Sequence, residues 1–322
     1  MIEKATTEIS DIRSSENGDG RFMDFFSRQI KFLEECGKFG TASNYKRTWN
    51  SFSGFLRDTH LLIDALTLPV VEEYNDWLTK RGILRNSSSF YMRILRSIYN
   101  KGVRKGLWSP SNLFCSVYTG IDKTRKKAVS ASIINKLINL DISGHKTLEL
   151  TRNIFLFSLY ARGMAFVDLA MLKKEYISGD YLCYRRQKTG QLMQIHLEPC
   201  MKSIIKKYDT SENKGDYIFP IVKGKNSEEI FKSYKSALRM YNSRLKTLSK
   251  KMGLPNFLSG YTARHTWATM ARDANIPLSV ISAGMGHSNE SVTLVYLNSL
   301  ENKVIDSANK KILSKIEKSL SL

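Results

Sequence analysis

The chain has 322 residues, of which 42% are hydrophobic, and its 50 lysines and arginines exceed its 30 aspartates and glutamates to leave a formal net charge of +20. This apolar content can fill packed cores and excludes an intrinsically disordered chain, while the length favours two domains. The positive excess points to a polyanionic partner.

Membrane and secretory classes are also excluded by the sequence. No stretch approaches the roughly 20 consecutive apolar residues that a spanning helix needs, and the polar leader of residues 1–20 has no hydrophobic signal segment. The four cysteines lie far apart and form no Cys-x-x-Cys pair, so neither a zinc site nor a disulfide framework is predicted. We therefore expect a cytoplasmic protein with no metal, no cofactor and no membrane partner.

Four helices are predicted within residues 21–105, because apolar side chains recur there at helical spacing. The first runs to about Phe39, the second opens at Thr41, the third spans Thr67 to Gly82, and the fourth extends from Asn86 to about Lys105. One face of the fourth helix is basic and is either a solvated surface or a strip that lies on phosphates. The net charge favours phosphates, and the residues expected to contact them are Arg93, Arg96, Arg104 and Lys105.

Residues 106–127 are predicted to be a linker, because they combine serine, proline and glycine with a closing basic run. The larger second domain, residues 128–322, begins with helices near 131–140 and 146–161. Alternating residues between Tyr176 and Leu197 then predict short antiparallel strands with turns at Gly179 and Gly190, and helices resume after Pro199. The fold class is mainly α (α+β): a helical bundle followed by a helical domain with a small antiparallel sheet.

The most informative pattern lies near the end of the chain. Arg264 follows Tyr261 by three residues, His287 follows Arg264 by 23 and stands directly after a glycine, and Tyr296 follows His287 by nine. In this order and spacing the residues resemble the catalytic domain of the tyrosine recombinases, the lambda-integrase family, which carries His-x-x-Arg, Gly-His and a nucleophilic tyrosine. Each element alone is common, whereas the combination is specific.

The resemblance implies a site-specific DNA recombinase in which Tyr296 attacks a phosphate, forms a 3′-phosphotyrosyl bond and releases a 5′ hydroxyl. Arg264 would donate two parallel hydrogen bonds to the phosphate oxygens, and His287 a further one. Lys188 matches the family's lysine in a turn between two strands, which acts as general acid towards the 5′ oxygen. Beside it, Arg185 and Arg186 are expected to contact DNA.

Two positions depart from the family pattern. Tyr261 stands where the family has its first histidine, and a phenol there would orient the phosphate or nucleophile more than it would deprotonate. Ala165 stands where the family has its first arginine. Arg162, three residues earlier, is the expected substitute, because neighbouring helical turns lie about 5 to 6 Å apart. The other candidates to replace the first arginine are Arg152, Arg185 and Arg186.

The resemblance extends to most of the chain. Residues 21–105 resemble the core-binding domain that clamps DNA opposite the catalytic domain. The tail, residues 297–322, carries one more apolar stripe, which would dock on a neighbouring protomer in a homo-tetramer on two DNA sites or else pack on its own domain. Off DNA we expect a monomer or weak dimer. Accessory DNA-bending proteins are possible partners, and integration, excision and inversion would all use this machinery.

Two other functions remain open at this stage. A non-catalytic DNA-binding relative with the same fold is one alternative, since the first arginine is missing. The other is a type IB topoisomerase, which uses a similar tyrosine but relaxes supercoils without a specific site. The short chain and its separate N-terminal bundle favour the recombinase over the topoisomerase.

Overall fold

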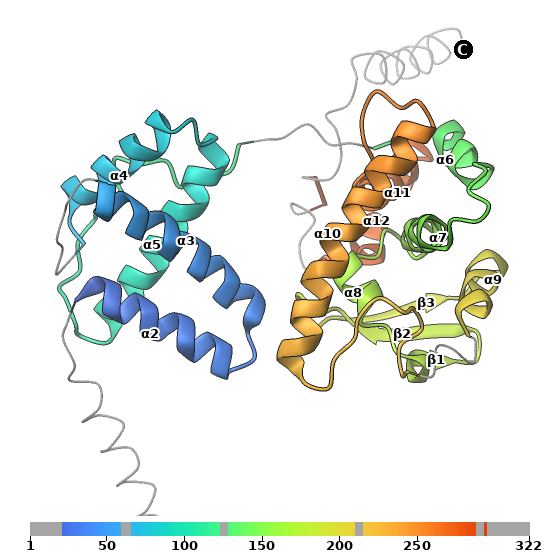
Figure 1. The fold of residues 1–322 in the computed structure, drawn as a ribbon, viewed down its shortest axis with the longest axis horizontal. Coiled ribbons are helices and arrows are strands. Elements are labelled where there is room, and N and C mark those ends of the chain that lie inside the picture. Colours follow the sequence, from blue (N-terminus) through green and yellow to red (C-terminus); the bar gives the residue numbers. More distant parts are fainter. Residues whose placement is uncertain (1–20, 59–65, 123–127, 210–214, 288–292, 295–322) are drawn as a thin grey trace, which may run out of the picture. The chain divides into compact units, whose positions relative to one another are not determined.

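The computed structural model describes residues 21–58, 66–122, 128–209, 215–287 and 293–294 (Figure 1). The chain divides into two compact units, residues 1–123 and 124–322. Among the described helices, none is long and apolar enough to cross a lipid bilayer. All four cysteines lie in the described segments and are free thiols.

In its described residues the first unit is a bundle of four helices, as the apolar spacing predicts. They are α2 (Phe22–Glu35), α3 (Phe39–Asp58), α4 (Leu68–Lys80) and α5 (Arg85–Arg104). Its core is aromatic: Phe22 meets Phe52 edge to face with ring centroids 6.1 Å apart, and Phe52 meets Tyr74 in the same way at 4.9 Å. These three rings are fully buried, so burial of each contributes about 1.5 to 3 kcal/mol to the stability of the bundle. Their edge-to-face contacts also favour one arrangement of the helices.

Most of the predicted linker belongs to this first unit. The Trp108 ring occupies the space beside Gly102, where an added Cβ would lie 2.0 Å from it, and its indole N–H donates to the Tyr99 carbonyl at 3.0 Å. Leu113 and Phe114 are buried in the same core. Residues 106–122 therefore pack as an extension of α5 and not as a free connection, because their apolar side chains find partners in the bundle.

The second unit is built around one buried helix, α7 (Lys146–Tyr160), which lies against four other described helices. Its Ile154, Phe155 and Phe157 are buried, so this helix is apolar on more than one face, as expected for a central element. The remaining helices are α6 (Ala131–Ile138), α8 (Phe166–Ala170), α9 (Pro199–Tyr208), α10 (Ser227–Lys251), α11 (Thr262–Asp273) and α12 (Leu278–Gly284).

A small sheet forms one edge of this unit (Figure 1). Strands β1 (Ile177–Ser178), β2 (Tyr181–Arg185) and β3 (Leu192–His196) pair antiparallel in the order β1-β2-β3. Leu182 and Tyr184 of β2 face the core, whereas their neighbours face outward. The predicted sheet and fold class are confirmed, and the turn between β2 and β3 carries Lys188.

Candidate active site

The backbone that follows α7 makes an unusual turn. Arg162 has φ of 60° and Gly163 has φ of 71°, so two successive residues adopt the left-handed conformation. An added Cβ at Gly163 would lie 2.7 Å from the Arg264 Cα, so glycine is required both for the backbone conformation and for the close approach of α11. For Arg162 this conformation costs about 1 kcal/mol, a strain that is typical of functional sites.

Arg264 lies at the centre of the site, in the first turn of α11, with only 4% of its surface exposed. Its Nη1 donates to the carbonyl of Gly163 at 2.8 Å, and its Nη2 donates to the carbonyl of Met285 at 2.7 Å. The same Nη2 lies 2.8 Å from Nε2 of His287. The guanidinium is therefore fixed before any substrate arrives, by groups from the loop after α7 and from the end of α12.

His287 is bonded through both ring nitrogens. Because a guanidinium can only donate, its contact with Arg264 requires Nε2 to accept. The proton is then on Nδ1, which lies 2.8 Å from Oγ1 of Thr293. Burial first, and then the nearby charges of Arg264, Arg186 and Lys188, lower the pKa of the imidazole to about 4. His287 is accordingly neutral at pH 7.

Arg186 is buried, in contrast to its exposed neighbour Arg185. It donates from Nη1 to the carbonyl of Gly286, and its Nε lies 3.8 Å from Oδ2 of Asp168. Burial raises the pKa of the Asp168 carboxyl, although the Gln187 amide and Arg186 oppose that effect. The structure differs here from the expected DNA contact: Arg186 connects the hairpin to the loop that carries His287, because alternate residues of a strand face opposite sides.

Lys188 is exposed in the turn between β2 and β3, where the sequence predicts it. The turn is closed by two backbone hydrogen bonds, from the Arg186 amide to the Gln191 carbonyl at 2.9 Å and from the Gly190 amide to the Arg186 carbonyl at 2.8 Å. Arg185 donates to the Gly190 carbonyl at 3.1 Å, which braces the same turn. Because the Lys188 charge contributes to the low pKa of His287, the turn lies close to the centre of the site.

Arg162 and Ala165 lie on either side of Gly163. Arg162 is half-buried, and its Cδ lies 3.7 Å from the place of a Cβ added to Gly284, so its side chain packs beside that glycine. Ala165 lines a cavity of about 190 Å³ together with Tyr261 and Arg264. Tyr261 itself is 55% exposed. The structure thus brings both departures from the family pattern to the surroundings of Arg264.

The other expected residues fall in different places. Arg152 donates to the carbonyls of Ile138 and Leu140 at 3.1 and 3.0 Å, so it holds the connection between α6 and α7. Tyr296 lies outside the described residues. On the first unit, Arg93 is half-buried, whereas Arg96, Arg104 and Lys105 are exposed.

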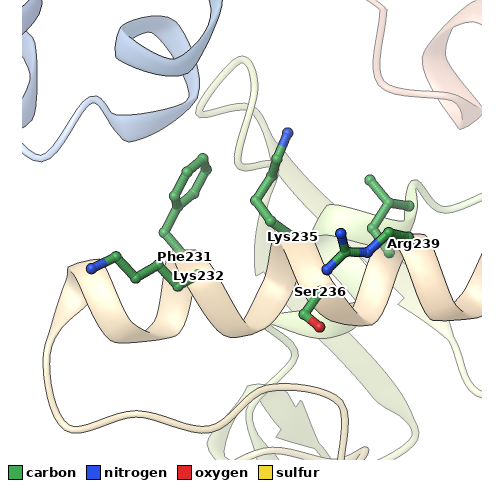
Figure 2. Close-up of a pocket in the computed structure, with 6 residues that line it drawn as sticks. Phe231, Lys232, Lys235, Ser236 and Arg239 are labelled. Atoms are coloured by element: carbon green, nitrogen blue, oxygen red, sulfur yellow. The ribbon is translucent and has the colours of Figure 1, made fainter. Parts of the chain in front are cut away.

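Sequence reasoning missed a basic surface on α10, which Figure 2 shows. It surrounds a depression of about 470 Å³ whose lining residues are Phe231, Lys232, Lys235, Ser236, Leu238 and Arg239. The three cations recur at steps of three and four, which places them on one face of a helix. That spacing was the available signal, and Figure 2 shows Phe231 and Lys235 projecting from the helix, with Arg239 further along it.

Two family models match the chain. The phage integrase SAM-like domain matches residues 21–115, and the phage integrase family model matches residues 127–303, which is more than half of the chain. The chain belongs to the phage integrase family. This confirms the resemblance read from Arg264, His287 and Tyr296, and the protein is a tyrosine-type site-specific recombinase of this family.

Known relatives and solved structures agree with this assignment. The tyrosine recombinase XerC of Rickettsia typhi is 26% identical over 256 residues, which is 76% of this chain and 80% of the relative. A lambda integrase dimer bound to a COC′ core site is similar in fold, with a TM-score of 0.63 at 17% identity over 85% of this chain and 94% of that one. A lambda integrase tetramer bound to a Holliday junction is also similar in fold. Its TM-score is 0.65 at 16% identity, and the match covers 88% of this chain and 80% of that one.

The low pKa of His287 gives a direct prediction. A titration followed by nuclear magnetic resonance of the histidine side chains should give His287 a midpoint near 4, well below its ordinary value of 6.5. Arg264→Gln should raise that midpoint, because a repelling charge is removed. Between these pH values the unfolded chain binds a proton that the folded chain does not, so this contribution to stability is present above about 6.5 and is lost as the pH falls towards 4. A midpoint at or above 6.5 would contradict the described geometry.

Proposed function

We propose that this chain cleaves DNA with Tyr296 as the nucleophile and that Arg264, His287 and Lys188 act on the same phosphate. The observation that carries the proposal is the fixed Arg264 guanidinium, which is held by two carbonyls and His287 within reach of the Lys188 turn. Such preorganised cations are what a phosphoryl transition state requires. The DNA-bound lambda integrase structures of similar fold support DNA as the substrate.

The proposed reaction has two balanced steps. The Tyr296 oxygen bonds to the phosphorus and releases its phenol proton to solvent, as the bond to the 5′ oxygen breaks and Lys188 gives its proton to that leaving oxygen. The 5′ hydroxyl of a partner strand then attacks the 3′-phosphotyrosyl bond and returns its proton to Lys188. The DNA is rejoined, and the released Tyr296 oxygen regains a proton from solvent. Because the protein linkage preserves the phosphodiester bond energy, no cofactor or external energy source is needed. In this scheme Tyr261 orients the phosphate or the nucleophile.

The competing function is DNA binding without cleavage, which Ala165 favours because it replaces the family's first arginine. Covalent trapping separates the two. A nicked duplex carrying the recombination site, taken from the DNA that flanks the gene, should give a protein adduct that resists denaturant, because loss of the short cleaved strand prevents rejoining. The Tyr296→Phe variant should give none. An adduct of equal yield with Tyr296→Phe, or none with the wild type, would overturn the assignment.

We propose that Arg162 supplies the charge that Ala165 lacks. Its side chain is half-buried beside Gly284, its charge acts on the Tyr184 phenol together with the charge of Arg264, and its backbone holds a strained conformation. Strain of this kind persists only where the surroundings or the function require it. Arg162 would therefore face the same phosphate from the side opposite α11.

This proposal predicts the effect of Arg162→Gly. Glycine suits a φ of 60°, so the variant should fold with unchanged or slightly higher thermal stability. Its cleavage rate in the trapping assay should fall about 10²- to 10³-fold, because one transition-state cation is lost. Adding Ala165→Arg should restore part of the rate, while Arg272→Gln, a surface change on α11, should leave it unchanged. If Arg162→Gly cleaved at the wild-type rate, another residue would have to supply the positive charge that Ala165 lacks.

We also propose that the basic surface of α10 binds the DNA backbone, together with Arg96, Arg104 and Lys105 of α5. Lys235 and Arg239 carry no described ion pair, whereas Lys232 pairs with Glu228 at 2.6 Å. The aromatic Phe231 between these cations adds a flat apolar contact for a sugar. Such a surface holds phosphates without reading sequence.

Salt dependence tests this surface. Affinity for a short duplex of arbitrary sequence should fall steeply with salt, and the double variant Lys235→Gln, Arg239→Gln should reduce the slope of log affinity against log salt by about two. Lys202→Gln is the matched control, because Lys202 of α9 is already paired with Asp180 at 2.5 Å. If the double variant had the same slope of log affinity against log salt as the wild type, α10 would not be part of the DNA-binding surface.

The assembly follows from the same proposal. The tail, residues 297–322, lies outside the described residues, and we keep the proposal that it joins protomers into a homo-tetramer on two sites. The lambda integrase structure of similar fold, a tetramer on a Holliday junction, supports an assembly of four protomers. Residues 21–105 would form the clamp domain and residues 128–322 the catalytic domain. A recombinase of this kind acts where the DNA lies, which in a bacterial cell is the cytoplasm, with or without DNA-bending partners.

A further inference from the structure

Thr293 holds the imidazole of His287 on the side opposite Arg264. Its side chain is fully buried, and its Oγ1 lies 2.8 Å from Nδ1 of His287, while Arg264 lies 2.8 Å from Nε2. The ring thus lies between a guanidinium that can only donate hydrogen bonds and a hydroxyl that can both donate and accept them. This asymmetry determines what His287 does in each state of the reaction.

In the structure, His287 has its proton on Nδ1 and its Nε2 lone pair directed at Arg264. In that form Nε2 has no proton to give to a phosphate oxygen. A hydrogen bond from Nε2 to the transition state requires Nε2 to gain a proton from solvent while Nδ1 gives one up. Arg264 then stops donating to Nε2 but stays bonded to the carbonyls of Gly163 and Met285. The imidazole keeps one proton and stays neutral throughout this exchange.

A hydroxyl suits both forms of the ring. It accepts from Nδ1–H in the arrangement described, and by rotating its hydrogen it donates to bare Nδ1 once the proton is on Nε2. A carbonyl or carboxylate in its place would only accept and would hold the ring in the first form. We propose that Thr293 is the positioning residue that orients His287 and lets it change from acceptor of Arg264 to donor towards the phosphate.

The position of Thr293 in the chain adds a second consequence. Thr293 precedes Tyr296 by three residues, so the two Cα atoms are at most about 11 Å apart. The hydroxyl that orients His287 is therefore carried by the segment that carries the nucleophile.

The test rests on the proposed function and uses a double-mutant cycle in the trapping assay. Thr293→Val keeps the shape of the side chain and removes the hydroxyl, and should slow cleavage about 10- to 100-fold, the range seen when a partner that orients a functional histidine is lost. Thr293→Ser should stay within a few fold of the wild type. In the His287→Ala background, Thr293→Val should have no further effect, because Thr293 acts through His287.

A merely structural role would give a different pattern. The losses from Thr293→Val and His287→Ala would then multiply, and Thr293→Ser would fail to restore the rate. Either result would overturn the inference, as would a wild-type rate for Thr293→Val. Thermal unfolding of each variant checks that it is folded, and Thr293→Ala replaces Thr293→Val if the valine variant does not fold.

A spectroscopic measurement separates this inference from the recombinase assignment. Long-range proton–nitrogen spectra of the DNA-free protein, with His287 assigned by comparison with His287→Gln, should place the proton on Nδ1 in the wild type. The Nδ1 resonance should shift in Thr293→Val and not in Thr293→Ser. A wild-type proton on Nε2 would defeat the inference even if trapping succeeds, whereas failure of wild-type trapping with the expected spectra would defeat the recombinase mechanism alone.

Discussion

The site depends on the burial of one positive charge. Removing a guanidinium from water costs several kcal/mol unless its N–H groups find partners, and the described partners of Arg264 are the carbonyls of Gly163 and Met285 and the neutral ring of His287. These are dipoles, which stabilise a charge without cancelling it. The charge of Arg264 also acts on the buried Asp168 carboxyl, where it opposes the rise in pKa caused by burial, and the two carbonyls tie the loop after α7 to the end of α12.

This arrangement constrains the backbone at three glycines. Gly163 lets the loop approach the Arg264 Cα, Gly284 leaves room for the Trp267 ring, and Gly286 lies where a Cβ would meet Met193 and Arg186. Side chains at these positions would push the parts of the site away from one another. The backbone therefore approaches the guanidinium closely at these glycines. This close approach allows the β2–β3 hairpin, α11, α12 and the loops after α7 and α12 to meet around Arg264.

Much of this organisation could be predicted from the sequence, because it depends on local signals. Apolar spacing predicted the helices of the first unit, and α6 and α7 of the second, to within a few residues, and alternation with glycine turns predicted the hairpin that carries Lys188. Arg264 and His287 were found by spacing, and the structure joins them by a 2.8 Å contact. The placement of Tyr296 stays a prediction.

The remaining features depend on tertiary contacts that local patterns do not encode. The Trp108 segment reads as a linker because it is rich in serine, proline and glycine, yet its aromatic and apolar side chains pack against α5. Arg186 reads as a surface cation, and only the buried Asp168 beside it and the Gly286 carbonyl explain its burial. Thr293 carries no sequence signal of its own, since a threonine near a histidine is common.

The charges around His287 give the site a preference for its occupied state. Arg264, Arg186 and Lys188 all disfavour protonation of the ring, while the buried Asp168 carboxyl lies beside Arg186 and partly offsets this positive charge. If the proposed function holds, a DNA phosphate at this point would offset the rest and would raise the pKa of the imidazole. The cations that keep His287 neutral would then also attract the phosphate, so that both effects would be consequences of one electrostatic arrangement.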